Sequence, residues 1–361
     1  MSGNTFAYML KFVIIDYICI GSHVALKIRT MNLRKFPVLL SAAALCVAGC
    51  SKNDDFKTLV EVKGGRAAVN LNYAADAAEV AAVIADADAH GVTHYLLKGE
   101  FAKLGIKRVG TSPDNPVGVV NPFRGTNAEV IDFSRVTGWP DVNIDEGTVV
   151  KGMPDNSFHD DGAIFGEPYY PRLKHVVFPS AVKGVGVNAF RGLLTLEKVT
   201  APGFTLVGPV AFAHCESLPE VDFPNVKTVK FAAFMGCSSL SKVNLPNADV
   251  VEYESFLFCR ALTRLRLPAA VFIGQHCFWE CGSLSELDLP DAVTAETPVF
   301  FNCGAMSLLK LTAPGELNMD GDLFVESEDT KNCALVLNRN KRSEVRYKQW
   351  RGRIWKSIAF E

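Results

Sequence analysis

The sequence lacks an excess of positive charge, with 37 basic and 39 acidic residues among 361. Residues 1–49 hold five of the basic residues and one of the acidic residues. The rest of the chain therefore has 32 basic and 38 acidic residues and a formal charge of −6. Proteins that bind nucleic acids lead with a basic surface. The charge balance therefore argues against nucleic acid as a partner.

Short catalytic motifs are also absent. The chain has no HExxH, no GxSxG, no P-loop and no GxGxxG that opens a helix. The His-Asp-Asp stretch at residues 159–161 lies among loop-forming residues. Residues 141–145 (Asp-x-Asn-x-Asp) match a calcium loop only in part, because the glycine stands at position seven instead of six and position twelve is not Glu. We expect no enzyme activity, no cofactor and no metal site.

The apolar run at residues 36–47 is too short to cross a bilayer as a helix, which takes about 20 residues. It follows Arg34 and Lys35 and precedes small residues, which is the layout of a secretory signal peptide. We assign residues 31–49 to a lipoprotein signal peptide and residues 1–30 to a spurious upstream extension, with Met31 as the initiator.

The end of that segment, Val-Ala-Gly-Cys at residues 47–50, resembles a bacterial lipobox. The resemblance implies that Cys50 becomes the acylated N-terminus, and each buried CH₂ of an acyl chain contributes about 0.8 kcal/mol to membrane binding. The polar, acidic stretch at residues 51–55 resembles the export signal of Bacteroidota surface lipoproteins. Together these resemblances imply an outer-membrane protein exposed on the cell surface, which contacts the membrane through its lipid alone.

An internal repeat of 22 residues dominates the second half of the chain. Phenylalanine recurs at this spacing at Phe190, Phe212, Phe234, Phe256, Phe278 and Phe300. Cysteine follows three residues later at Cys215, Cys237, Cys259, Cys281 and Cys303. A unit of this length cannot bury its own apolar side, so stacked coils must share one continuous core.

Each unit contains one segment that predicts a short strand. In residues 240–245, Leu240, Val243 and Leu245 point inward, and Lys242 and Asn244 point outward. The proline that follows cannot donate a backbone hydrogen bond and therefore ends the strand.

The unit reads Val-x-x-x-Ala-Phe-x-x-Cys-x-x-Leu-x-x-Val-x-Leu-Pro, and over residues 173–312 it resembles the BspA-like class of leucine-rich repeats. The resemblance implies an α/β leucine-rich-repeat right-handed solenoid, made mostly of short parallel strands and turns with small helical caps at both ends. It also implies adhesion, with an extracellular protein of the host matrix or of a bacterial surface as the partner.

The two ends predict covers for the stack. Residues 50–70 form the lipid anchor, a tether and an edge element, and residues 71–172 form an N-terminal cap with degenerate repeats. A helix is expected at residues 76–90, where Asp76 and Glu79 make a capping box and Gly91 ends the helix. Residues 313–361 form a C-terminal cap, in which a strand precedes an amphipathic helix with its aromatic residues inward.

The in-phase cysteines are interpreted as core and not as a metal site. A tetrahedral thiolate site needs ligands that converge on a point, whereas these residues run in a line along the stack. Five members cannot all pair as disulfides, and a buried free cysteine behaves as a small hydrophobic residue. The phenylalanine row is interpreted in the same way.

The outward strand positions carry charges whose sign nearly alternates from coil to coil. We call the following eight residues the charge ladder: Lys198, Glu220, Asp222, Lys242, Arg264, Arg266, Glu286 and Asp288. One interpretation is that opposite charges on neighbouring strands fix the register. The other is that this face recognises a ligand. No aromatic residue stands on it, which disfavours sugar stacking there.

A basic run at residues 339–356 is interleaved with aromatic residues and contains one acid, Glu344. It is either an amphipathic cap or a possible anionic-glycan patch formed by Arg342, Arg346, Tyr347, Trp350 and Arg351.

Three functions follow from these patterns. The first is a surface adhesin that binds a protein through the charge ladder. The second is an accessory glycan-binding lipoprotein, and the third is a structural surface antigen with no fixed ligand.

Overall fold

A computed structural model describes residues 58–108, 119–160, 166–291, 294–315, 318–319, 321–324 and 330–361, together with one N-terminal hairpin. The hairpin pairs β1 (Val13–Ile20) with β2 (His23–Thr30) and belongs to a separate unit at residues 1–54. The signal peptide and Cys50 lie outside the described residues.

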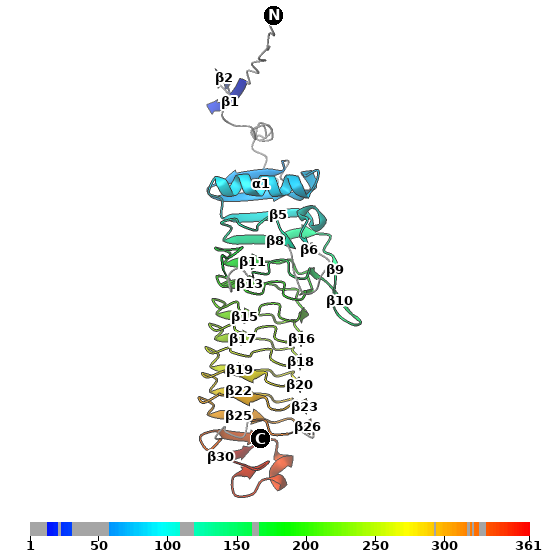
Figure 1. Ribbon diagram of the computed structural model, residues 1–361, viewed down its shortest axis with the longest axis vertical. Coiled ribbons are helices and arrows are strands. Elements are labelled where there is room, and N and C mark those ends of the chain that lie inside the picture. The colour runs from blue at the N-terminus through cyan, green and yellow to red at the C-terminus, as the bar shows by residue number, and fades with distance from the viewer. Residues whose placement is uncertain are drawn as a thin grey trace, which may run out of the picture. The chain divides into compact units, whose positions relative to one another are not determined.

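Residues 55–361 form the second unit, whose described part is a solenoid of stacked coils (Figure 1). One side of the described stack is a continuous nine-stranded sheet, in which neighbours beyond the first hairpin are parallel. Its strands are β9 (Asp141–Asp145), β10 (Thr148–Met153), β12 (Gly184–Val185), β14 (Leu206–Val207), β16 (Thr228–Val229), β18 (Val250–Val251), β20 (Phe272–Ile273), β23 (Thr294–Ala295) and β26 (Asn318–Met319). The predicted solenoid of short parallel strands is confirmed.

The opposite side carries the charge ladder, and we call it the ladder side. Within the described residues it consists of three sheets, interrupted between β13 and β15 and between β17 and β19. Its strands are β3 (Val60–Lys63), β4 (Arg66–Asn70), β5 (His94–Glu100), β8 (Val130–Thr137), β11 (His175–Val177), β13 (Lys198–Thr200), β15 (Glu220–Asp222), β17 (Lys242–Asn244), β19 (Arg264–Arg266), β22 (Glu286–Asp288), β25 (Leu308–Leu311), β27 (Ala334–Leu337) and β30 (Ser357–Phe360). Strand β3 lies at the sheet edge, where the sequence placed an edge element.

The turn that contains the repeated phenylalanine forms a third hydrogen-bonded ladder. The backbone N–H of Phe190 donates to the carbonyl of Ala211 in the next coil at 2.8 Å, and Phe212 donates to Ala233 at 2.9 Å. Residues two positions before and after the phenylalanine have positive φ. They are Asn188, Gly192, Val210, His214, Ala232, Gly236, Glu254, Phe258, His276, Glu280 and Asn302. In the last two of these turns the ladder is regular enough to form β21 (Phe278–Trp279) and β24 (Phe300–Phe301).

The six phenylalanines lie in one buried, stacked row with ring centroids 5.3–5.9 Å apart. Phe158 extends the row at one end, 5.4 Å from Phe190, and Phe324 extends it at the other, 4.7 Å from Phe300. These two residues stand 32 and 24 positions from their neighbours, off the 22-residue spacing. The period alone therefore could not identify them.

The five in-phase cysteines are buried, and all seven cysteines of the second unit that the structure describes are free thiols. Each in-phase Sγ donates to the carbonyl of the phenylalanine 25 residues earlier, at 3.0–3.2 Å, as Cys259 does to Phe234. Burial raises the pKa of the Cys237 thiol to about 12. The row therefore packs as a hydrophobic residue would and also satisfies a buried carbonyl in each coil, which the sequence interpretation missed.

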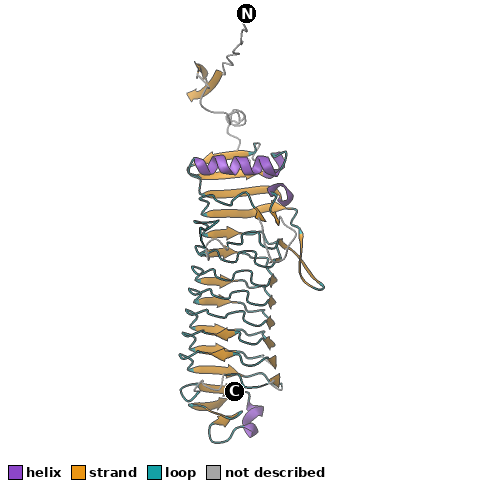
Figure 2. Ribbon diagram, viewed as in Figure 1, coloured by secondary structure: helices purple, strands orange, loops and turns teal. Residues whose placement is uncertain are grey.

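The N-terminal cap is formed by α1 (Ala77–Ala89), which is the purple helix across the first strands in Figure 2. Asp76 accepts from the Glu79 N–H at 2.9 Å, and Glu79 accepts from the Ala75 N–H at 2.7 Å. These contacts make a variant of the expected capping box, in which Glu79 reaches the N–H of Ala75 and not that of the N-cap residue Asp76. Val80 and Ile84 are fully buried against the coil beneath. Two 3-10 helices, η2 (Leu71–Tyr73) and η3 (Phe101–Leu104), complete this end.

The C-terminal cap differs from the expected amphipathic helix. Its helical part is the 3-10 helix η4 (Arg339–Glu344), which is followed by a hairpin of β28 (Gln349–Trp350) and β29 (Arg353–Ile354). Trp350 and Trp355 are buried, whereas Tyr347 is 98% exposed and Ile354 is 45% exposed. The helix fails because Tyr347 and its neighbours adopt positive φ, which a right-handed helix does not allow.

Candidate functional site

The charge ladder is largely paired within itself. Arg266 Nε lies 2.9 Å from an Asp288 oxygen, and Arg264 Nε lies 3.6 Å from Glu286. Lys242 Nζ lies 4.0 Å from a Glu220 oxygen, and Asp222 accepts from the side chain of Asn244 at 2.7 Å. Each contact joins residues that are aligned on adjacent strands.

These pairs agree with the register-fixing interpretation, and they also leave the face accessible. The side chains of Arg264 and Lys242 are 77% and 75% exposed. Exposed pairs of this kind each stabilise a fold by about 0.2–1 kcal/mol, so a partner can compete for them at low cost. The ladder can therefore exchange internal ion pairs for external ones.

The Asp-x-Asn-x-Asp stretch forms strand β9 and not a loop. Its three polar side chains lie on the exposed face of the strand, and the two residues between them are buried. Asp141 pairs with Lys151 at 2.9 Å, and Asp145 pairs with Lys230 at 2.5 Å. Lys230 also binds Glu252 at 2.7 Å. We call this group of Asp145, Lys230 and Glu252 the latch. A calcium site would need the carboxylates of Asp141 and Asp145 as ligands, but both are paired with lysine side chains.

The latch perturbs two pKa values. The hydrogen bond from Lys230 is the main reason that the pKa of Asp145 lies below its ordinary value. Burial lowers the pKa of Lys230, but the hydrogen bonds to Asp145 and Glu252 outweigh burial and leave it raised. The hairpin β9–β10 also packs Val142 and Ile144 against Leu206 of β14. It thus lies along the outer face of the nine-stranded sheet and is fixed at its tip.

The His-Asp-Asp stretch has a structural role where it is described. The Asp160 carboxylate is buried and accepts from the backbone N–H groups of Tyr169 and Tyr170, both at 2.9 Å. It thereby orders the turn before β11. Asp161 lies outside the described residues. Within the part of the chain that is described, no group of three or more His, Cys, Asp or Glu residues could hold a metal ion.

Partly exposed aromatic side chains gather outside the C-terminal segment, where the sequence places its aromatic surface. Phe231 stacks on Tyr253 at 4.4 Å, and Trp279 contacts His276 at 3.9 Å and Phe301 at 4.9 Å. Tyr253 is 46% exposed. All five lie within three positions of a repeated phenylalanine, in the turns that contain these phenylalanines. Their phase is visible in the sequence, but the repeat pattern alone does not indicate that these side chains reach the surface.

The possible anionic-glycan patch is partly dispersed. Trp350 is 3% exposed and donates its Nε1 hydrogen to Glu344 at 3.2 Å, so its ring forms no part of the exposed surface. The Arg351 guanidinium lies over the Trp350 ring at 5.3 Å, and that of Arg342 lies over Phe360 at 5.1 Å. Arg342, Arg346, Tyr347 and Arg351 remain at the surface.

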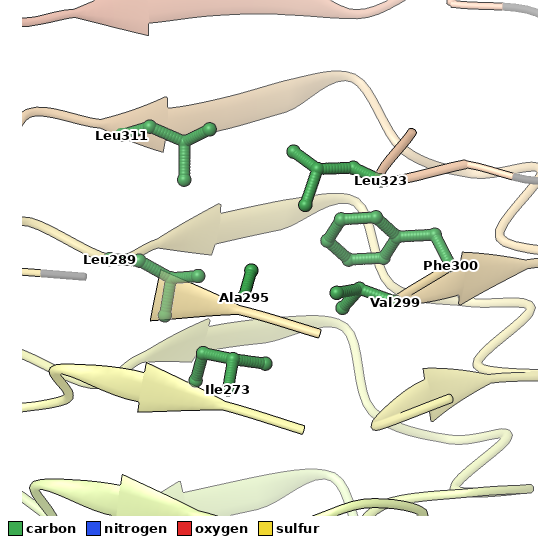
Figure 3. A pocket seen from close by; sticks show the side chains of 7 residues that line it. All are labelled: Ile273, Leu289, Ala295, Val299, Phe300, Leu311 and Leu323. Atoms are coloured by element: carbon green, nitrogen blue, oxygen red, sulfur yellow. The ribbon is translucent and has the colours of Figure 1, made fainter. Parts of the chain in front are cut away.

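A small cavity lies inside the last coils, with a volume of about 10 Å³ (Figure 3). Seven apolar side chains line it: Ile273, Leu289, Ala295, Val299, Phe300, Leu311 and Leu323. A void of this size holds at most one water molecule, and this lining offers no side-chain hydrogen-bond partner. The cavity is therefore a packing defect and not a ligand site.

A comparison with known protein families identifies the type of repeat. The family model described as "BspA type Leucine rich repeat region" matches in six copies over residues 168–271 and 205–329. The chain carries a BspA-type leucine-rich repeat region. The resemblance seen in the sequence is confirmed. Repeat regions of this type are generic protein-interaction modules and are typically non-catalytic.

Three solved structures are similar to the chain. A leucine-rich repeat protein of T. pallidum is 23% identical with a TM-score of 0.40, over 56% of this chain and 88% of that one. One from Bacteroides ovatus is 21% identical with a TM-score of 0.36, over 46% and 48% of the two chains. A leucine-rich cell surface protein of Faecalibacterium prausnitzii is 18% identical with a TM-score of 0.33, over 58% and 69%. No curated protein matches the chain.

Among the described residues, no helix has the length and hydrophobicity that a membrane crossing requires.

Proposed function

We propose that the chain is a cell-surface lipoprotein that binds an extracellular protein through its BspA-type repeat region. The observation that supports this role is the charge ladder on successive parallel strands, which presents exposed ions of both signs on a flat, regular face. Extended solenoid faces of this kind commonly serve recognition. The partner we propose is a matrix protein of the host or a surface protein of another bacterium.

The ladder would act through charge complementarity. Charged side chains at an interface steer the encounter and fix the orientation of the partner. Because the pairs on this face are exposed, binding through them should weaken as salt rises. An interface of ordinary size takes about 800 Å² from each partner, which spans several coils.

A charge-swap variant tests this role without breaking the ladder. In Arg264→Glu, Arg266→Glu, Glu286→Arg, Asp288→Arg, each pair keeps its opposite charges, so stability should stay close to that of the natural chain. The natural chain is first screened against a panel of immobilised matrix proteins. The swap variant should bind at least tenfold more weakly to each matrix protein that the natural chain binds. A matched control, Lys227→Glu with Arg260→Glu, changes two exposed bases away from the ladder and should bind normally. Unchanged binding by the swap variant would point to another face, and no binding by the natural chain would point to a structural antigen.

The lipid anchor is proposed from the lipobox-like end of the signal peptide. Cys50 would carry the acyl chains and hold the solenoid at the outer membrane. Replacing Cys50 with serine should move the protein from the membrane fraction to the soluble fraction and abolish metabolic labelling with palmitate. Labelling that persists in this variant would contradict the assignment.

A further inference from the structure

Charge is strongly segregated along the solenoid. Residues 330–361, which we call the basic cap, contain nine basic and two acidic residues, whereas residues 58–329 contain 21 basic and 34 acidic residues. The formal charges are therefore +7 and −13. The basic cap closes the end of the stack opposite α1 (Figure 1).

Two of the nine cations serve the fold, and the other seven are exposed. The side chains of Lys341 and Arg353 are each only 12% exposed, and they pair with Glu344 at 3.4 Å and with Asp322 at 2.6 Å. The second oxygen of Glu344 accepts from Trp350 Nε1. The exposed cations of the hairpin region are Arg339, Arg342, Arg346, Lys348, Arg351 and Lys356. The one acid among them in sequence is thus engaged within the cap.

Two tight turns project side chains from this surface, one at Tyr347 and Lys348 and the other at Arg351 and Gly352 between β28 and β29. Tyr347 and Lys348 have φ of 51° and 62° and lie between Arg346 and Gln349, which exchange backbone hydrogen bonds of 3.1 and 2.7 Å. Positive φ at both central residues is the geometry in which Asn-Gly is strongly preferred. The chain instead places a tyrosine and a lysine there. Backbone strain of this kind concentrates at functional positions.

Two of these exposed cations lie over aromatic rings. The Arg351 guanidinium lies over Trp350, and that of Arg342 lies over Phe360. Trp350 is itself buried, so the ring that supports Arg351 belongs to the core of the cap. Contacts of this type limit the conformations of the arginine side chains and reduce the entropy that a ligand must remove on binding.

We propose that the basic cap is a binding site for an anionic polysaccharide, one that bears sulfate or carboxylate groups. The six cations complement its charges, and arginine forks suit such planar or trigonal anions. Tyr347 is 98% exposed and offers its ring to the C–H face of a sugar. Because the acidic body repels a polyanion, contact is confined to the cap. The site shares no residue with the charge ladder, so it stands apart from the proposed protein-binding role.

A polysaccharide suits the cap better than a lipid surface does. Membrane-bound surfaces combine cations with apolar side chains that enter the acyl region. The described residues of the cap expose Tyr347 at a polar turn and Ile354 on the hairpin, with no apolar face around them.

The test uses the full chain and measures dissociation constants by calorimetry at several NaCl concentrations. The probes are heparin, polygalacturonate and neutral dextran. Arg346→Glu, Lys348→Glu, Arg351→Glu should weaken binding to heparin or polygalacturonate at least tenfold. The variant should also reduce the slope of log Kd against log NaCl concentration by about two to three, since each neutralised contact contributes about 0.7–0.9 to this slope. Heparin binding alone would identify a sulfated ligand, and polygalacturonate binding alone a uronate.

Two further variants separate the site from bulk charge and from misfolding. Lys242→Glu, Arg264→Glu, Arg266→Glu makes the same change in net charge on the ladder and should bind within threefold of the natural chain. Tyr347→Asn, Lys348→Gly gives the turn its preferred residues, so the melting temperature should hold or rise while binding weakens severalfold.

Three outcomes would overturn the proposal. The first is an equal loss of binding in the ladder variant, which would show that net charge alone is responsible. The second is binding that the Asn-Gly turn leaves unchanged. The third is no binding to either anionic polysaccharide, including the case in which only phosphatidylglycerol vesicles or duplex DNA are bound.

Discussion

Ala295 interrupts a column of larger side chains that point inward from the nine-stranded sheet. The strands before it place Val185, Val207, Val229, Val251 and Ile273 at the same register position. The cavity in Figure 3 lies beside this alanine. The missing methyl groups thus explain the void.

Replacing Ala295 with valine should fill this void. We expect the free energy of unfolding to rise by about 1 kcal/mol, because the added methyl groups gain contacts that the cavity lacks. Urea denaturation of both proteins measures the change. Val251→Ala is the matched control, and it should lower stability by more than the first variant raises it. A loss of stability in Ala295→Val would mean that the site is already full.

At the same scale, the sequence predicted the side chains of the core better than the backbone of its turns. Core residues such as Phe212 and Cys215 can be recognised in the sequence because stacking requires the same side chain at the same place in each coil. The positive φ values of the turns cannot be recognised in this way, since Val210, Glu254 and Phe258 occupy positions that favour glycine. There the hydrogen bonds between coils impose a conformation that the residue itself disfavours.

At the scale of elements, the hairpin β9–β10 is held by the latch at its tip. The lowered pKa of Asp145 means that its ionised form stabilises the native state. This contribution is complete above the ordinary value of 3.8 and is lost as pH falls through the lowered value. The raised pKa of Lys230 means that its contribution is lost only above 10.5. The latch therefore holds between these limits.

Amide hydrogen exchange of residues 141–153 reports the opening of the hairpin. Exchange, corrected for its intrinsic pH dependence, should stay constant from pH 7 down to 3.8, the ordinary value of the Asp pKa, and accelerate at lower pH as Asp145 protonates. Lys230→Met should show fast exchange already at pH 7 and little further change on acidification. If this variant kept the slow exchange of the natural chain, apolar packing on Leu206 alone would hold the hairpin.

The caps show where element prediction succeeds and fails. Helix α1 was predicted because Asp76 and Glu79 form a local signal that does not depend on the rest of the fold. The sequence favours an amphipathic helix in the C-terminal cap because basic and aromatic residues are interleaved there and because the segment resembles the closing cap of the family. Trp350 and Trp355 are indeed buried, but a hairpin delivers them to the core. Interleaving over so few residues cannot distinguish the two.

For the whole molecule, the shared core predicts that coils can be removed only in complete units. Deleting residues 256–277 removes 22 residues and joins Ser255 to Phe278, which keeps the phenylalanine and cysteine rows in phase. We expect this protein to unfold cooperatively with a smaller denaturant m-value, because less surface is exposed on unfolding. Deleting residues 256–266 alone should abolish cooperative unfolding. Equal behaviour of the two deletions would contradict a stacked core.

The two sides of the stack differ in continuity, and this has a mechanical consequence. Backbone hydrogen bonds between coils run along the long axis, so tension applied along that axis loads them directly. The nine-stranded sheet carries such a load without a break, whereas the ladder side is interrupted between β13 and β15 and between β17 and β19. Under a pull the rod should therefore yield first at these two seams, flexing about the uninterrupted sheet as a hinge does. A tethered protein built in this way bends toward its load before it ruptures.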